Sequence, residues 1–148
     1  MSGIDEDAVV TLNVLIETCK DGELGFRTAA DDTRNAEAQR MFLVLARERA
    51  ELAAELQREV QRLGGTPAAA GSVSGSLHRG WMNLTAAVSG SDEAAIIAAA
   101  ERGEDSAKTA YERALREPLP AGTRTLVERQ YARIRAAHDR VSTLKRAA

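Results

Sequence analysis

Apolar side chains recur at intervals of three and four residues along four long stretches of the chain, which places them in one stripe on one face of a helix. This spacing predicts amphipathic helices over residues 5–31, 35–63, 92–116 and 122–145. Alanine, leucine, glutamate and arginine dominate, and aromatic residues make up only 3% of the chain, a composition typical of helices rather than strands. We therefore predict an all-α fold, with residues 1–148 forming a single domain.

The connections between the expected helices differ in length. Residues 31–34 and 117–120 are short breaks, which predict that the helices on either side are antiparallel neighbours. Residues 64–91 are too long for a hairpin, and their apolar side chains have near-helical spacing. We expect this segment to be a crossover that contains a short helix over residues 75–88. Such a crossover lets the second and third long helices run parallel, which is the ferritin-like arrangement of a four-helix bundle.

Polar side chains interrupt the apolar stripe of every expected helix. The interrupting residues are Glu23 in the first helix, Arg49 with Glu48 on its edge in the second, Glu104 with Glu101 one turn earlier in the third, and His138 in the fourth. At 1.5 Å per residue these positions lie near one level of the bundle. We therefore expect a polar layer across the core, in which Glu23, Glu104 and His138 are buried and face each other.

Two interpretations of this layer remain open. Carboxylate oxygens and imidazole nitrogens from facing helices bind cations such as Fe²⁺, Mn²⁺ or Zn²⁺, and the candidate metal ligands are Glu23, Glu48, Glu101, Glu104 and His138. Alternatively, the layer is a buried ion-pair network in which Arg49 neutralises a carboxylate and fixes the register of the helices. Arg49 favours the second interpretation, because a guanidinium does not ligate metals.

Four segments carry a family resemblance: "LIETCKDGELGF", "GSVSGSLHRGWMNL", "ERGEDSAKTAYERAL" and "LVERQYARIRAAHDRV". On these segments the chain resembles, over nearly its full length, a bacterial ferritin-like four-helix-bundle family of unknown function. The resemblance implies the ferritin-like fold and association into a homodimer or another self-assembly, but no established activity.

The third helix adds a finer likeness, because Glu101 and Glu104 are similar to the paired glutamates of rubrerythrins. By analogy with the wider superfamily, the chain would take part in stress or iron handling, and an enzymatic member would be a metal-dependent oxidoreductase. Two departures from the di-iron pattern stand against a full di-iron centre. The second helix has no histidine, and Arg135 replaces the glutamate expected three residues before His138.

Charge and cysteine content indicate which partners and which cellular location to expect. The formal net charge is −2, and we expect neither nucleic acid nor a membrane as a partner. A single cysteine and the lack of a signal-peptide pattern favour a cytoplasmic location. The first helix is acidic and the fourth is basic, so we expect these two helices to be neighbours that compensate each other.

The first helix has further features outside its main stripe. Val10, Val14 and Leu24 form a second apolar face, which either the crossover helix or a second subunit would cover. Gly22 and Gly25 flank Glu23 and weaken the helix, so we expect them to allow the close approach of another element such as the crossover helix. The roles of His78 and Trp81 in the crossover stay open.

Overall fold

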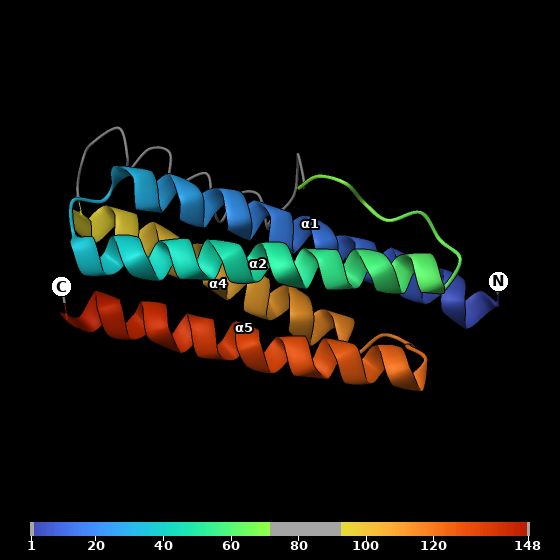
Figure 1. Cartoon of the computed structure of the whole chain (residues 1–148). Helices are drawn as coiled ribbons and strands as arrows, with labels where there is room; N and C mark the ends of the chain where they lie inside the picture. Colours follow the sequence, from blue (N-terminus) through green and yellow to red (C-terminus); the bar gives the residue numbers. More distant parts are fainter. Residues whose placement is uncertain (1, 72–92, 148) are drawn as a thin grey trace.

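The computed structural model describes residues 2–71 and 93–147, which form four long α-helices (Figure 1). In chain order these are α1 (Gly3–Asp32), α2 (Ala36–Arg62), α4 (Glu93–Ala114) and α5 (Ala121–Ala147). Each begins and ends close to one of the four helices expected from the sequence. The expected short helix over residues 75–88, with His78 and Trp81, lies outside the described residues.

Local sequence signals account for the ends of α2. The side chain of Asn35 accepts a hydrogen bond of 2.9 Å from the backbone N–H of Ala38, which caps the N-terminus of the helix. At the other end Gly64 has a φ of +87°, a conformation that glycine adopts without steric cost. The backbone N–H of Gly65 then donates to the carbonyl of Val60 at 3.0 Å, so α2 closes with a Schellman motif.

Two helices of the bundle run in one direction and two run in the opposite direction. α1 and α5 run one way along the bundle, and α2 and α4 run the other way (Figure 1). The carboxylate of Glu93, at the first position of α4, accepts hydrogen bonds from the Thr33 hydroxyl at 2.5 Å and from the backbone N–H of Arg34 at 2.6 Å. It thereby ties the start of α4 to the turn between α1 and α2. The predicted fold class, an all-α bundle with parallel second and third long helices, is confirmed.

The neighbours of each helix correct one expectation. α1 packs against α2 and α4, whereas α5 packs against α4 and more lightly against α2. α1 and α5 therefore occupy opposite corners of the bundle (Figure 1). The expectation that the acidic first helix and the basic fourth helix are neighbours is wrong. The arginines of α5 instead reach acids on α2: Arg129 lies 2.9 Å from Glu55, and Arg133 lies 3.3 Å from Glu48.

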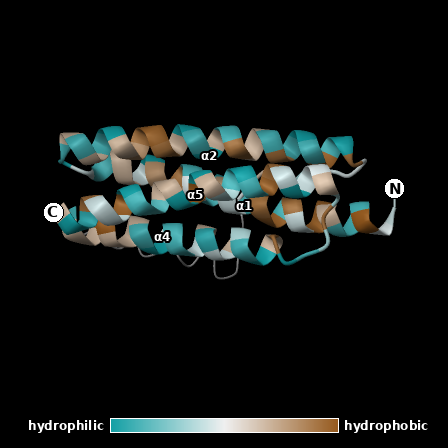
Figure 2. Cartoon of the chain, turned by 90° about the horizontal axis from the view of Figure 1, so that it is seen from below, coloured by the Kyte–Doolittle hydropathy of each residue, from teal (hydrophilic) through white to brown (hydrophobic). Residues whose placement is uncertain are grey.

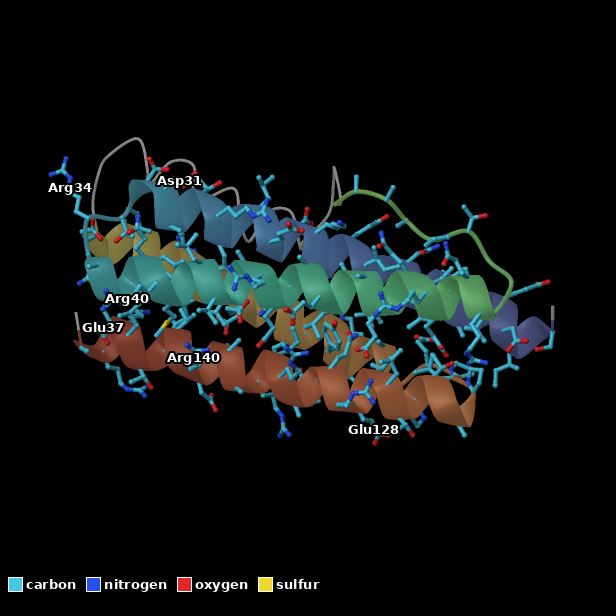
Figure 3. The ribbon with its side chains drawn as sticks, viewed as in Figure 1. Asp31, Arg34, Glu37, Arg40, Glu128 and Arg140 are labelled. Carbon is cyan, nitrogen blue, oxygen red and sulfur yellow. The ribbon has the colours of Figure 1, made fainter. Side chains whose placement is uncertain are left out.

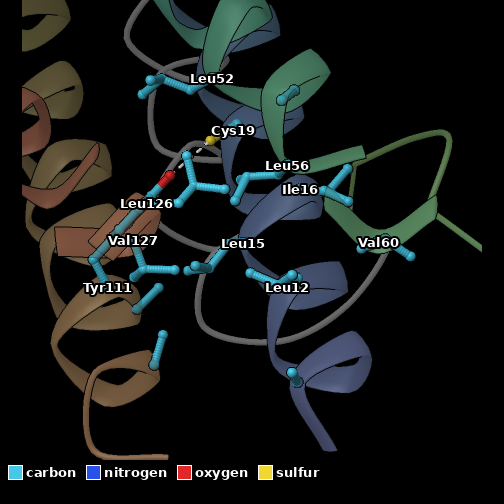
Figure 4. Packing of buried hydrophobic residues seen from close by; sticks show 14 of the residues in the cluster. Leu12, Leu15, Ile16, Cys19, Leu52, Leu56, Val60, Tyr111, Leu126 and Val127 are labelled. Carbon is cyan, nitrogen blue, oxygen red and sulfur yellow. Dashed lines mark hydrogen bonds between the residues drawn. The ribbon is translucent and has the colours of Figure 1, made fainter. Parts of the chain in front are cut away.

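Two clusters of buried apolar side chains fill the bundle. One cluster includes Phe26 and Phe42, whose rings stack with their centroids 6.0 Å apart. The other includes Leu15, Leu56 and Val127 and is shown in Figure 4. Hydrophilic and hydrophobic residues alternate along every helix (Figure 2). In the part of the chain that the structure describes, no helix combines the length and apolar character needed to cross a bilayer.

A polar level separates the two clusters. Along α2, Arg49 lies between Ala46 of one cluster and Leu52 of the other. Along α4, Glu104 lies in the same way between Ala100 and Ala107. The interruption of the apolar stripes that the sequence revealed on these two helices is therefore a real feature of the core.

Candidate functional site

Arg49 of α2 and Glu104 of α4 form an ion pair in the centre of the bundle. Nη2 of Arg49 lies 2.5 Å from Oε1 and 2.6 Å from Oε2 of Glu104, so one amino group donates to both carboxylate oxygens. Neither side chain has any exposed surface. Because α2 and α4 lie at opposite corners of the bundle, the pair bridges them through the core.

The neighbouring helix α1 makes room for the guanidinium. A Cβ atom built on Gly22 would lie 2.8 Å from Nη1 and 3.3 Å from Cγ of Arg49. Any side chain at position 22 would therefore collide with Arg49. One turn further along α1, the ring of Phe26 lies beneath the guanidinium, with its centroid 5.4 Å from Cζ. A ring face attracts a cation most strongly where water is excluded, so Phe26 supplements the Glu104 carboxylate.

The pair holds its charges against a strong desolvation effect. Burial raises the pKa of Glu104, and the charge of Arg49 opposes that rise. Burial also acts to lower the pKa of Arg49, but the Glu104 carboxylate reverses this, and the net pKa lies above the ordinary value. Among the described residues, Nε and Nη1 of Arg49 find no hydrogen-bond partner. Each member of the pair thus depends on the other to remain charged in the core.

A second buried polar chain lies beside the ion pair. The hydroxyl of Tyr111 donates to Oε1 of Gln130 at 2.8 Å, so the thiol of Cys19, 3.2 Å from the same hydroxyl, donates to it (Figure 4). Nε2 of Gln130 continues the chain to Oε1 of Glu55 at 2.7 Å and to the carbonyl of Leu52 at 3.3 Å. Three helices, α1, α4 and α5, are thereby linked to α2 by hydrogen bonds.

Burial also sets the chemistry of Cys19. It raises the pKa of the thiol, although the positive charge of Arg49 acts in the opposite direction. The side chain has no exposed surface. A thiol that is buried and held protonated is a poor nucleophile, so Cys19 serves as a hydrogen-bond donor in the core.

Sequence reasoning did not single out Gln130, although a signal was present. Gln130 lies between Val127 and Ile134 on the buried stripe of α5, as Glu104 does on α4, and it is 1% exposed. A polar residue at that position must find partners inside the core. Tyr111 carries a weaker signal, because a buried tyrosine hydroxyl also needs a partner.

Two of the residues expected in the polar layer lie at its rim. The side chain of Glu23 is 17% exposed and pairs within α1, at 2.9 Å from Arg27 and 4.0 Å from Lys20. The side chain of His138 is 20% exposed, and its Nε2 lies 2.5 Å from Oδ1 of Asp105. The expectation that Glu23 and His138 face Glu104 across the core is therefore wrong.

The helical register explains the displacement of His138. The buried residues of α5 around this level are Ile134, Ala137 and Val141. His138 follows Ala137 directly, and one residue turns an α-helix by about 100°. The imidazole is therefore rotated out of the core toward the groove between α4 and α5.

The remaining two candidates also have partners at the rim. Oε2 of Glu48 lies 3.3 Å from Nη2 of Arg133. Glu101 accepts hydrogen bonds from Lys145 at 2.8 Å and from the Ser142 hydroxyl at 3.0 Å. The hydrogen bond from Lys145 is the main cause that lowers the pKa of Glu101.

The positions of the five candidate ligands show whether they could together hold the metal ion that the ferritin-like resemblance implies. Within residues 2–71 and 93–147, no three His, Cys, Asp or Glu side chains are grouped so that they could hold one metal ion. Glu104 has both oxygens on Arg49, and the other four candidates each have a separate partner. Cationic and hydrogen-bonding side chains of the protein itself occupy these carboxylates, except at Oε1 of Glu48, which is buried and has no hydrogen-bond partner among the described residues. One such oxygen is too few donors to hold an ion, so the described residues do not fit a metal centre.

The fold and its central ion pair define a ferritin-like four-helix bundle with a guanidinium in its core. A solved structure of a mutant of Mycobacterium smegmatis Dps1 is similar, with a TM-score of 0.77 over 98% of this chain and 99% of that chain. The two sequences are 13% identical, so the likeness concerns the fold alone.

The chain belongs to the family described as Domain of unknown function (DUF2383), whose sequence model matches residues 7–117. A search of curated proteins gave no match. The matched range includes the whole of α1, α2 and α4 apart from the first residues of α1. It therefore contains both Arg49 and Glu104.

The buried hydroxyl of Tyr111 provides a first test of the site. We expect Tyr111→Phe to lower the free energy of unfolding by about 1–3 kcal/mol, because Gln130 and Cys19 lose their shared partner inside the core. Urea unfolding of the variant and the wild type measures this difference. The matched control is Tyr131→Phe, which removes a hydroxyl that donates to Glu112 at 2.6 Å near the surface. Equal losses in the two variants would contradict a special role for the buried chain.

Proposed function

We propose that this protein is a non-catalytic ferritin-like bundle that acts by associating with protein chains, and that its buried ion pair serves to fix the register of the helices. The observation that carries the proposal is the position of Nη2 of Arg49, within 2.6 Å of both oxygens of Glu104. A carboxylate whose two oxygens both accept hydrogen bonds from one guanidinium already has its negative charge compensated, so it gains little from a metal ion. The positive charge beside it also opposes the approach of a cation.

Register is a physical role that a buried ion pair fills well. An apolar core tolerates small shifts of one helix along another, because many packing arrangements have similar energies. A shift that separates Arg49 from Glu104 would leave two uncompensated charges in the core, which costs several kcal/mol. The pair thereby favours one alignment of α2 with α4, and Gly22 extends that alignment to α1.

Association is supported by apolar side chains on the surface of α1 and α2. Val10 and Leu24 are each 68% exposed, and Val14 is 44% exposed. On α2, Leu43 and Val44 are 49% and 51% exposed. We propose that these side chains contribute to a contact with another chain, because large apolar side chains on a surface gain from being removed from water. We include in the proposal a homodimer or another self-assembly, and a cytoplasmic location, which suits the single buried cysteine.

The alternative is a metal-binding bundle in stress or iron handling, with Fe, Mn or Zn held by some of Glu23, Glu48, Glu101, Glu104 and His138. That function requires the Arg49 side chain to leave Glu104 when metal binds. It also requires Glu23 and His138 to turn inward from their partners at the rim. Each movement would break an ion pair or hydrogen bond that the described structure contains.

Elemental analysis of the protein, purified without a chelating tag, separates the two functions. We expect iron, manganese and zinc each far below one equivalent per chain, because the core carboxylate is neutralised internally. The analysis is repeated after incubation with each metal and removal of the excess by gel filtration. One equivalent of any of these metals retained by the wild type, and lost in Glu104→Gln, would overturn the proposal.

A further inference from the structure

Four facing pairs of side chains cross the groove between α4 and α5. On α4 the positions follow one another at intervals of four, three and four residues, so they share one face of the helix: Glu101, Asp105, Lys108 and Glu112. On α5 the same intervals recur in the opposite direction: Ser142, His138, Arg135 and Tyr131. Because α4 and α5 are antiparallel (Figure 1), each of these positions on α4 has a counterpart on α5.

Three of the four pairs join an acid of α4 to a hydrogen-bonding side chain of α5. The two polar atoms are 3.0 Å apart at Glu101, 2.5 Å apart at Asp105 and 2.6 Å apart at Glu112. The fourth pair departs from this pattern, because it consists of two cations, Lys108 and Arg135. At this position alone of the four, α4 offers no acid to α5.

Neither cation of the fourth pair has an anionic partner. Within residues 2–71 and 93–147, no ion pair involves Lys108 or Arg135. Two acids close by in the sequence are directed at the imidazole of His138 instead. Oδ1 of Asp105 lies 2.5 Å from its Nε2, and Oδ1 of Asp139 lies 3.6 Å from its Nδ1. The protein therefore supplies the two positive charges without a carboxylate between them.

A pocket of about 290 Å³ lies at the fourth pair. It is lined by Lys108, Ala132, Arg135, Ala136, His138 and Asp139. The two alanines have short side chains, so they leave space on α5 beside the cations. The guanidinium of Arg135 lies over the ring of Tyr131, with Cζ 4.9 Å from the centroid, and this contact restrains the arginine at the pocket. A molecule in the pocket thus meets one cation from each helix.

We propose that this pocket binds an oxyanion of the phosphate class, either the free ion or the end group of a small molecule. The anion occupies the place of the acid that the fourth pair lacks. Arg135 can donate two parallel hydrogen bonds to two of its oxygens, and Lys108 contributes a second positive charge from the other helix. The bound anion thereby links α4 to α5, as the acids do at the other three pairs. This binding site is independent of the proposed association with protein chains.

A titration of the full-length ¹⁵N-labelled protein with inorganic phosphate tests the proposal, with sodium chloride used to hold the ionic strength constant. We expect saturable shifts of the backbone amides around Lys108 and Arg135. Glycerol phosphate and acetate are titrated in the same way. Whichever of the two phosphates binds more tightly identifies the source of the anion, and acetate should bind more weakly because it has one charge.

Two variants and a matched control assign the binding to the pocket. Arg135→Gln should weaken phosphate binding about tenfold, because it removes a charge-assisted hydrogen-bond donor. Lys108→Glu should abolish binding, because it supplies the missing acid opposite Arg135, and its melting temperature should equal or exceed that of the wild type. The control is Arg140→Gln, which removes the same charge from α5 at an exposed position outside the pocket (Figure 3).

Three results would overturn the proposal. The first is a wild type that gives no saturable shift with either phosphate. The second is an equal loss of affinity in Arg135→Gln and Arg140→Gln, which would indicate general attraction of anions to a charged helix. The third is phosphate binding that persists in a folded Lys108→Glu variant. None of these results bears on the oligomeric state, so the proposed association is tested separately.

Discussion

Replacing Arg49 with leucine is expected to lower the free energy of unfolding by about 3–5 kcal/mol, because it leaves the Glu104 carboxyl in the core without its cation. That carboxyl must then either bear an unpaired charge or take up a proton against its ordinary pKa. A typical domain has only about 5–15 kcal/mol of stability, so the variant should lose a large part of its resistance to urea. Adding Glu104→Leu to Arg49→Leu should recover most of the loss, since the double variant has no buried charge. Urea unfolding of the two single variants and the double variant measures these differences.

The neighbouring Arg47 provides the control for this prediction. Arg47 lies on the same helix and is exposed to water. Arg47→Leu therefore makes the same chemical change as Arg49→Leu, but at the surface instead of in the core. Its expected effect is within about 0.5 kcal/mol of the wild type. If Arg49→Leu and Arg47→Leu were equally mild, the ion pair would not be a determinant of stability.

Replacing Gly22 with alanine is expected to destabilise the protein by about 1–3 kcal/mol through overpacking. Helix propensity alone predicts the opposite sign, because alanine is favoured over glycine by about 1 kcal/mol within a helix. The new Cβ would lie 2.8 Å from Nη1 and 3.3 Å from Cγ of Arg49, and a buried arginine tied to Glu104 cannot move aside freely. Thermal unfolding followed by circular dichroism measures the shift.

The matched change at Gly122 isolates the steric cause. A Cβ on Gly122 of α5 meets nothing within 4 Å, so Gly122→Ala should be neutral or slightly stabilising. In an Arg49→Leu background, the penalty of Gly22→Ala should shrink, because leucine is shorter than arginine. Stabilisation by Gly22→Ala similar to that by Gly122→Ala would show that position 22 is not a close contact.

The fold could be predicted from the sequence because its signals are local. The apolar stripes, the Asn35 cap and the glycines after α2 mark helices without reference to the rest of the chain. The length of the crossover then restricts the topology to one with parallel α2 and α4. The packing of α1 diagonally opposite α5 is not local information, and the sequence analysis placed those two helices together.

The candidate site was predictable only in part. Arg49 and Glu104 lie at the centres of their stripes. A real helix turns by slightly more or less than about 100° per residue, but at the centre of a stripe this deviation leaves the side chain buried. Glu23 and His138 lie nearer the edges of theirs, where a small rotation moves a side chain from the core to the rim. Charged residues at such edges find partners in their own helix or the next one, as Glu23 does with Arg27.

Gly22 illustrates a different limit. The sequence indicated the close approach of another element at this position and offered the crossover helix as an example. The approaching group is the side chain of Arg49, which belongs to α2 and is separated from Gly22 by a turn and half a helix. Such a contact depends on the register between α1 and α2, which no local signal in the sequence determines.

The most direct test of the central claim is the melting temperature of Arg49→Leu with and without Fe²⁺, Mn²⁺ or Zn²⁺, the iron under anaerobic conditions. If the guanidinium of Arg49 is the internal cation of this core, none of the metals will raise the lowered melting temperature of the variant, and none will change that of the wild type. Recovery of the variant toward the wild-type melting temperature with any one metal would contradict the account. It would mean that Glu104 and its neighbours form a metal site that Arg49 merely covers.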